Sequence, residues 1–151
     1  MKKLGIMFLV GFVLQACTKC YEGPEENIVF TSIDNDVLFG AGDEDIDAGI
    51  YVFRRAKDWD DYKVKMDAVN EVTTDYPSID FDHEMVIVAM DEVLADGGNV
   101  FEITAIQHEN KKLIVEVLKY SPNGWSPTVI TQPFHVISME KSSCDVELRL
   151  K

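Results

Sequence analysis

The stretch Met85-Val86-Ile87-Val88-Ala89-Met90 (MVIVAM) decides the fold of this chain. We expect it to form the body of a strand from Glu84 to Val93. A strand with one solvated face alternates apolar and polar residues, whereas an unbroken apolar run is typical of a strand that is covered on both faces. The rest of the fold must therefore supply cover for two sides of this strand.

One helix is predicted ahead of this strand. Trp59, Tyr62, Met66 and Val69 recur at steps of three and four residues, which places them on one helix face. The acidic, glycine-bearing segment 34–49 is expected to be a loop. Six further apolar segments read as strands, namely Ile28–Ile33, Ile50–Arg55, Val100–His108, Leu113–Tyr120, Phe134–Glu140 and Cys144–Leu150.

Strands and helices do not alternate along the chain, which argues against a parallel doubly wound sheet. We therefore predict an α+β fold, with a mostly antiparallel β-sheet or small sandwich of about seven strands and one helix packed on one side. The length of 151 residues suits one domain, and we place it at residues 28–151.

The charge balance excludes one large class of function. The chain has 27 acidic residues against 14 Lys and Arg, which gives a net charge of −13. Nucleic-acid binding requires clustered cations to neutralise phosphates. We therefore expect no nucleic-acid partner.

The first sixteen residues have the pattern of a secretory signal peptide. Lys2 and Lys3 precede an apolar run from Leu4 to Leu14, and a small residue follows before the expected cleavage point. A membrane-spanning helix needs roughly 20 apolar residues, so this run is too short to be one. Residues 1–16 are therefore predicted to be removed from the mature protein.

The boundary Leu14-Gln15-Ala16-Cys17 resembles a bacterial lipobox. The resemblance implies that Cys17 becomes a lipidated N-terminus, followed by a flexible tether over residues 17–27. We expect the protein in the cell envelope, anchored by lipid to a bacterial membrane, with the outer membrane or the cell surface favoured. The alternative is an ordinary signal peptide that is cut after Ala16, with no lipid.

Two further cysteines follow Cys17, at positions 20 and 144. Outside the cytoplasm the environment permits disulfides, so Cys20 and Cys144 could tie the tether to the last strand. Their spacing cannot show whether the two Cα atoms come within bonding range, and the pairing stays open at this point.

Several segments together resemble the PrcB family, which is named for a subunit of a bacterial cell-surface protease complex. The resemblance spans residues 50–141 and implies an accessory, non-catalytic role, in which a lipoprotein helps a secreted or surface protease to assemble or stay stable. It supplies no catalytic residues. The matching segments are Asp58-Trp59, Ile79-Asp80-Phe81 before the apolar strand, Gly97-Gly98, and Thr131-Gln132-Pro133-Phe134-His135-Val136.

Motifs of known catalytic and metal sites fail on inspection. The segment His83–Ile87 begins like a zinc-protease motif but has Ile87 in place of the second histidine. An EF-hand starting at Asp43 would have Ala48 and Arg54 where Gly and Glu are required. We expect no metal, no cofactor and no catalytic residues. The open alternatives are an enzyme with a site that no motif reveals and a looser calcium site of Asp43, Asp45 and Asp47.

Recognition is the function that the sequence favours. Trp125 lies in the turn-rich stretch SPNGWSP, where it either folds back onto the sheet or stands exposed as an anchor for a partner. We expect Trp125, Gly97, Gly98 and Phe134 to contribute to one partner-binding rim, if the sheet order brings them together. The alternatives are a surface glycan-binding lipoprotein that uses Trp125 and a protease inhibitor that acts through its loops.

Overall fold

The computed structural model describes residue 20, residues 26–121 and residues 127–151. The predicted signal peptide, the predicted lipidation site Cys17 and Trp125 lie outside the described residues. Within the described part of the chain, no helix is both long enough and apolar enough to cross a membrane.

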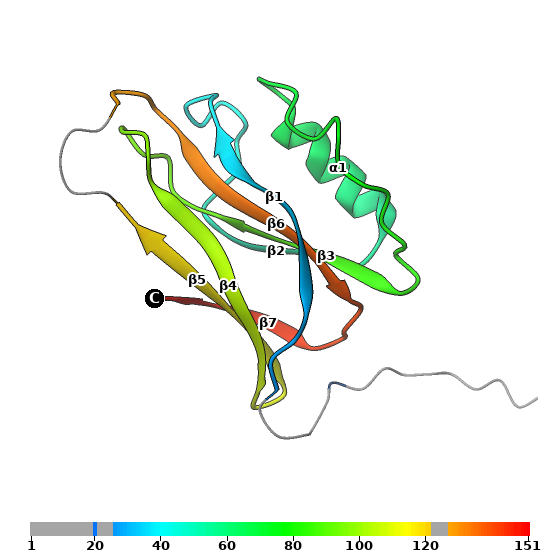
Figure 1. Ribbon diagram of the computed structural model, residues 1–151. Coiled ribbons are helices and arrows are strands. Elements are labelled where there is room, and N and C mark those ends of the chain that lie inside the picture. Colours follow the sequence, from blue (N-terminus) through cyan, green and yellow to red (C-terminus); the bar gives the residue numbers. More distant parts are fainter. Residues whose placement is uncertain (1–19, 21–25, 122–126) are drawn as a thin grey trace, which may run out of the picture.

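Two β-sheets and one helix form three layers (Figure 1). The first sheet is antiparallel with strand order β1-β6-β3-β2, and the second has the order β4-β5-β7. The predicted fold class is therefore confirmed. The elements are β1 (Phe30–Leu38), β2 (Gly49–Phe53), α1 (Ala56–Met66), β3 (Glu84–Met90), β4 (Val100–Glu109), β5 (Lys112–Tyr120), β6 (Gln132–Glu140) and β7 (Asp145–Leu150).

The apolar strand β3 lies in the interior of the first sheet, where Val88 pairs with Tyr51 of β2 and with Val136 of β6. Successive side chains of a strand point to opposite faces. Ile87 and its alternate neighbours pack between the two sheets, and Val88 and its alternate neighbours pack under the helix. The prediction that both faces of this strand are covered is confirmed.

The helix covers the outer face of the first sheet. Trp59, Tyr62 and Met66 are buried, and the Trp59 ring lies 5.3 Å from the Phe53 ring of β2. The helix ends at Met66, so Val69 lies beyond it and is 47% exposed. Its predicted place on the buried face is wrong, because the helix stops one turn too early.

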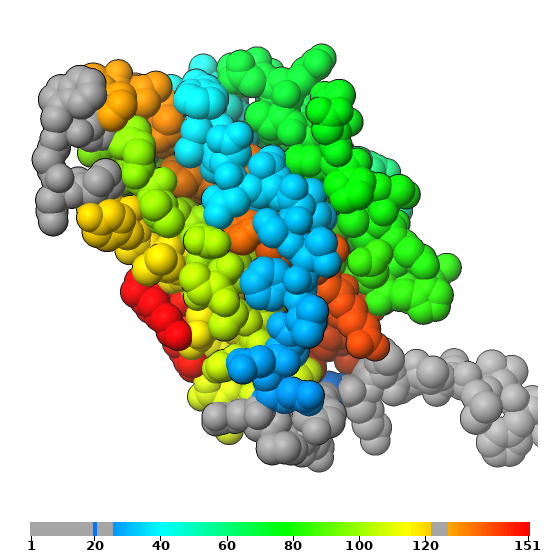
Figure 2. All heavy atoms as spheres, in the orientation of Figure 1, coloured from blue at the N-terminus to red at the C-terminus, as the bar shows by residue number. Residues whose placement is uncertain are grey.

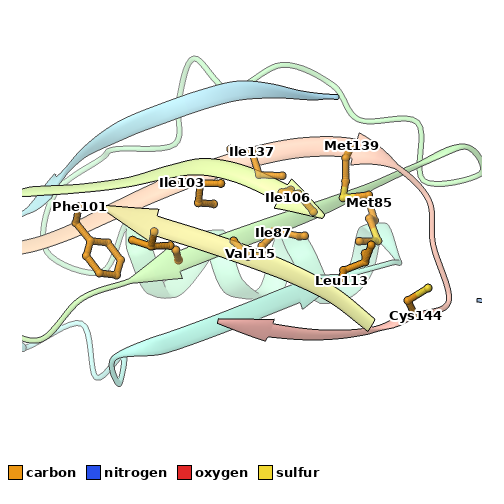
Figure 3. Close-up of a cluster of buried hydrophobic side chains, with 12 residues drawn as sticks. Met85, Ile87, Phe101, Ile103, Ile106, Leu113, Val115, Ile137, Met139 and Cys144 are labelled. Atoms are coloured by element: carbon orange, nitrogen blue, oxygen red, sulfur yellow. The ribbon is translucent and has the colours of Figure 1, made fainter. Parts of the chain in front are cut away.

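One cluster of buried apolar side chains fills the space between the two sheets (Figure 3). Apolar side chains from β3 and β6 meet those from β4 and β5, and burial of this area is the main source of stability for such a sandwich. The buried residues of this cluster are Met85, Ile87, Ala89, Phe101, Ile103, Ile106, Leu113, Val115, Val117, Ile137, Met139 and Cys144.

The strand β1 is longer than predicted, since residues 34–38 were expected in a loop. β1 pairs with β6 along one side and forms an edge of its sheet, so acidic residues on it reach water. Asp34 accepts a hydrogen bond of 2.7 Å from the Tyr76 hydroxyl. Tyr76 belongs to the segment between α1 and β3, which lies along β1 (Figure 2).

The last strand crosses from one sheet to the other. After β6 the chain turns through residues 141–144 and enters β7, which pairs in parallel with β5 from Lys112 opposite Asp145 to Val117 opposite Leu150. This crossover places Cys144 at one end of the sandwich, because the next residue, Asp145, lies opposite Lys112 at the turn between β4 and β5.

Candidate functional site

A disulfide joins Cys20 to Cys144 across 124 positions of sequence, with the Cα atoms 4.7 Å apart. Cys144 is buried, and its backbone carbonyl accepts a 2.7 Å hydrogen bond from the Arg54 guanidinium, which also binds the Ser142 carbonyl. The loop that carries Cys144 is therefore held in place from the side of β2. The structure settles a pairing that sequence spacing left open.

The segment after Cys20 also becomes part of the sheet. The Ile28 amide donates to the Ile106 carbonyl at 2.8 Å, the His108 amide donates to the Glu26 carbonyl at 3.2 Å, and Asn27 bridges to Gln107. The tether predicted over residues 17–27 is thus fixed to the domain at residue 20 and again from residue 26. We call this end of the sandwich, with Cys20, Cys144 and the turn at Asn110-Lys111, the disulfide end.

The same end contains a group of potential metal ligands. One ligand atom each from Cys20, His108 and Cys144 lie within 4.8 Å of one another, and this is the sole such trio among the described residues. Both sulfurs are bonded to each other, so neither is a thiolate that can bind a metal. The carboxylates of Asp43, Asp45 and Asp47 do not form such a group.

The opposite end of the sandwich brings together two of the predicted rim segments. Leu94 bridges to Thr131, and the Gly97 amide donates to the Pro127 carbonyl at 3.0 Å. A Cβ atom at Gly97 would lie only 2.9 Å from a methyl carbon of Val129. Gly97 is therefore needed for close packing between the two segments, because any larger residue would push them apart.

The other predicted rim residues differ in their placement. Gly98 is exposed and has a φ of +79°, a left-handed conformation that glycine adopts without strain. Phe134 has no exposed surface and belongs to the core under the helix, so its predicted contact with a partner is wrong. The reason is that β6 lies between β1 and β3 and is covered on both faces. Trp125 lies outside the described residues.

Exposed apolar side chains collect at this end of the sandwich. Ten large apolar residues are exposed in the described part of the chain, and six of them lie at the ends of β1, β3 and β5 or the starts of β4 and β6. Val100 pairs with Tyr120, and the Phe39–Gly42 turn approaches Val93. We call this surface the rim, and its members are Phe39, Val93, Val100, Leu118, Tyr120 and Ile130.

Buried polar contacts connect the segments that carry the rim. The buried Asp91 carboxylate lies 2.6 Å from the Lys119 ammonium, which links the chain after β3 to β5 in the other sheet. The Gln132 amide nitrogen donates to the carbonyls of Ile46 and Asp91 at 2.8 and 2.9 Å. These contacts hold three loops in one arrangement, so the rim is ordered before any partner arrives.

A buried histidine for which no role was predicted joins the two sheets. His135 of β6 accepts a 2.8 Å hydrogen bond at Nδ1 from the Ile103 amide of β4, so its proton is on Nε2 and is donated to the Ser32 hydroxyl at 2.8 Å. Burial lowers the pKa of His135. Because Nε2 carries the proton, His135 cannot act as a base toward Ser32, and the pair is structural rather than catalytic.

An acidic cavity of about 380 Å³ lies between α1 and β2, over the rings of Tyr51 and Tyr62. The helix carboxylates on its wall, Asp58 and Asp61, already form ion pairs with Arg55 and Lys57 of the same helix. These two negative charges are therefore neutralised within the chain. We take the rim, and not this cavity, as the candidate binding site.

Comparisons of this chain with protein-family models, with curated proteins and with solved structures found no match.

Proposed function

We propose that this protein is a lipid-anchored binding protein of the bacterial cell envelope that holds a protein partner on its rim. The partner class that we propose is a secreted or surface protease, which the accessory protein would help to assemble or stabilise. The protein itself performs no catalysis in this proposal.

The observation that carries the proposal is the concentration of exposed apolar residues at one end. Singly scattered apolar residues are normal on a protein surface, whereas a cluster favours an interaction site. Tyr120 and Phe39 offer the large rings that commonly dominate binding energy at protein interfaces. The Lys119–Asp91 pair beneath them keeps the surface rigid, which lowers the entropy cost of binding.

The disulfide supports a location outside the cytoplasm. Disulfides persist in oxidising compartments and are rare where thiols are kept reduced. The Cys20–Cys144 bond agrees in this respect with the signal peptide and the lipobox resemblance at Cys17. The choice of a protease as partner rests on the PrcB resemblance alone.

The proposal can be tested by affinity capture from detergent-solubilised membranes of the native host. The full-length tagged protein should recover a protease in near-equal amount, identified by mass spectrometry and then rebound from purified components. The double variant Phe39→Ser/Tyr120→Ser should lose it.

The matched control is Val64→Ser/Val69→Ser, which removes two exposed apolar residues elsewhere and should retain the partner. Repeated recovery of the protein alone would contradict the proposal, as would equal loss with both double variants. If the parent protein binds polysaccharides and the Phe39→Ser/Tyr120→Ser variant does not, the ligand of the rim is a glycan and not a protease.

A further inference from the structure

The disulfide changes the length of the lipid tether, and this inference rests on the proposed lipidation of Cys17. A chain spans at most about 3.6 Å per residue, so the three steps from Cys17 to Cys20 reach about 11 Å. Without the disulfide, the first fixed residue would be Glu26, at a reach of about 30 Å. The Cys20–Cys144 bond therefore shortens the path from lipid to folded domain roughly threefold.

We infer that the disulfide holds the domain upright on the membrane, with the disulfide end against the lipid headgroups and the rim directed toward soluble partners. The disulfide end contains the β4–β5 turn at Asn110-Lys111, where Lys112 lies opposite Asp145 of β7. In Figure 1 this turn and the start of β6 lie at opposite ends of the molecule.

The distance between the two ends is set by the strands. β5 runs from Lys112 at the disulfide end to Tyr120 at the rim, and the eight steps between its nine residues, at ~3.3 Å each, span about 26 Å. The rim thus stands well beyond the reach of the bilayer when the disulfide end is held within about 11 Å of the anchor.

Charge opposes the competing orientation, in which the domain lies on its side. The chain carries a net charge of −13, and an anionic membrane surface repels an acidic flank. Around the β4–β5 turn the charges nearly balance, because the cations Lys111, Lys112 and Arg149 lie among the carboxylates of Glu26, Glu109, Asp145 and Glu147. The membrane therefore repels this end less than it repels a flank with a larger excess of carboxylates.

The inference is tested on the lipidated full-length protein in vesicles that contain anionic lipid and nitroxide-labelled headgroups, which quench a dye on contact. A dye is attached through an encoded non-natural residue at position 110 or at position 99, in non-reducing buffer. The dye at 110 should be quenched several-fold more than the dye at 99. Equal quenching at the two positions would overturn the inference.

Two insertions of one Gly/Ser segment of about ten residues separate the disulfide from simple tether length. Between Lys19 and Cys20 the insertion lengthens the path from lipid to disulfide, and quenching at 110 should fall. Between Glu22 and Gly23 the same insertion lies outside that path, and quenching should stay at its original level until the disulfide is reduced. Both variants keep the disulfide, so their fold stays intact. If both insertions change the quenching at position 110 equally before reduction, the inference is contradicted.

The two possible failures can be told apart. If the protein does not associate with vesicles or host membranes at all, the proposed lipid anchor is wrong. If it associates but the two dyes or the two insertions behave alike, the anchor stands and the orientation is wrong.

Discussion

The ammonium of Lys119 lies 2.6 Å from the carboxylate of Asp91 and joins the two sheets of the sandwich directly beneath the rim. Lys119 comes from β5, whereas Asp91 immediately follows β3 in the other sheet. Asp91 is 4% exposed, so its carboxylate is largely removed from water and is paired with Lys119. The contact connects the stability of the fold to the shape of the proposed binding surface.

Replacing Lys119 with Met should lower the free energy of unfolding by roughly 1–3 kcal/mol, because it leaves a buried carboxylate unpaired. The double variant Lys119→Met/Asp91→Asn should recover part of the loss. Urea denaturation measures both. The control is Lys57→Met, which breaks an exposed ion pair and should change little. Equal effects of the two lysine variants would show that the buried pair has no special role.

Acidification should weaken the fold through His135. Its folded pKa lies below the ordinary 6.5, so the unfolded chain binds more protons in the window just below pH 6.5. Stability should therefore fall as pH drops through this window, and His135→Gln should flatten the dependence. The measurement is urea denaturation at several pH values between 7.5 and 5.

His83 provides a control of opposite sign for this pH dependence. Its hydrogen bond to Asp80 raises the pKa of His83, so its contribution to stability is present at low pH and lost as pH rises. His83→Gln should therefore make the loss on acidification steeper. A flatter profile in His83→Gln than in His135→Gln would reverse this assignment.

Removing the disulfide should destabilise the fold without abolishing it. The bond closes a loop across 124 positions, and native disulfides typically contribute about 2–4 kcal/mol. We expect a loss of that size in Cys20→Ser/Cys144→Ser, measured by urea denaturation in a Cys17→Ser background that lacks lipid. Reducing agent should lower the free energy of unfolding of the Cys17→Ser parent to that of the double variant, and it should leave the double variant unchanged. If it also destabilises the double variant, the loss does not come from breaking the disulfide.

Two phenylalanines near the rim should respond in opposite ways to the same change. Phe134→Ala opens a cavity under the helix and should cost about 3–5 kcal/mol of stability. Phe39→Ala removes a ring that is 55% exposed and should leave stability within about 0.5 kcal/mol while weakening partner capture. Thermal unfolding measures the stability of both variants, and affinity capture measures their binding to the partner. A loss of stability in Phe39→Ala but not in Phe134→Ala would contradict the placement of these two rings.

The sequence was most informative where one residue pattern has one structural solution. The unbroken apolar run 85–90 indicated a strand covered on both faces, and Trp59, Tyr62 and Met66 indicated the helix that supplies part of that cover. Both features depend on local periodicity, which a single chain displays directly.

Features that depend on distant partners could not be predicted from periodicity. Residues 34–38 look like an acidic loop, but they form an edge strand because β6 pairs with them. Phe134 begins the predicted strand Phe134–Glu140 and was expected to contact a partner, but it is buried because the helix covers the sheet face on which its side chain lies. The parallel pairing of β7 with β5 and the role of His135 likewise arise from contacts between separate segments.

The candidate site was predictable only in part. Gly97 and Phe134 were expected to share one rim; the structure joins the Gly97 segment to the chain before β6 but buries Phe134. The apolar rim itself was not expected, because its members are exposed residues at strand ends. Such residues show no periodic pattern in the sequence, and only the sheet order places them together.

The most direct test of the account is mass spectrometry of the protein extracted from its native membrane and cut after glutamate without reduction. We predict a single ion that contains Cys17–Glu22, bearing a diacylglyceryl group on Cys17, joined by a disulfide to Lys141–Glu147. Reduction should split this ion into its two peptides. An unmodified amino terminus, or free thiols at Cys20 and Cys144, would contradict the account.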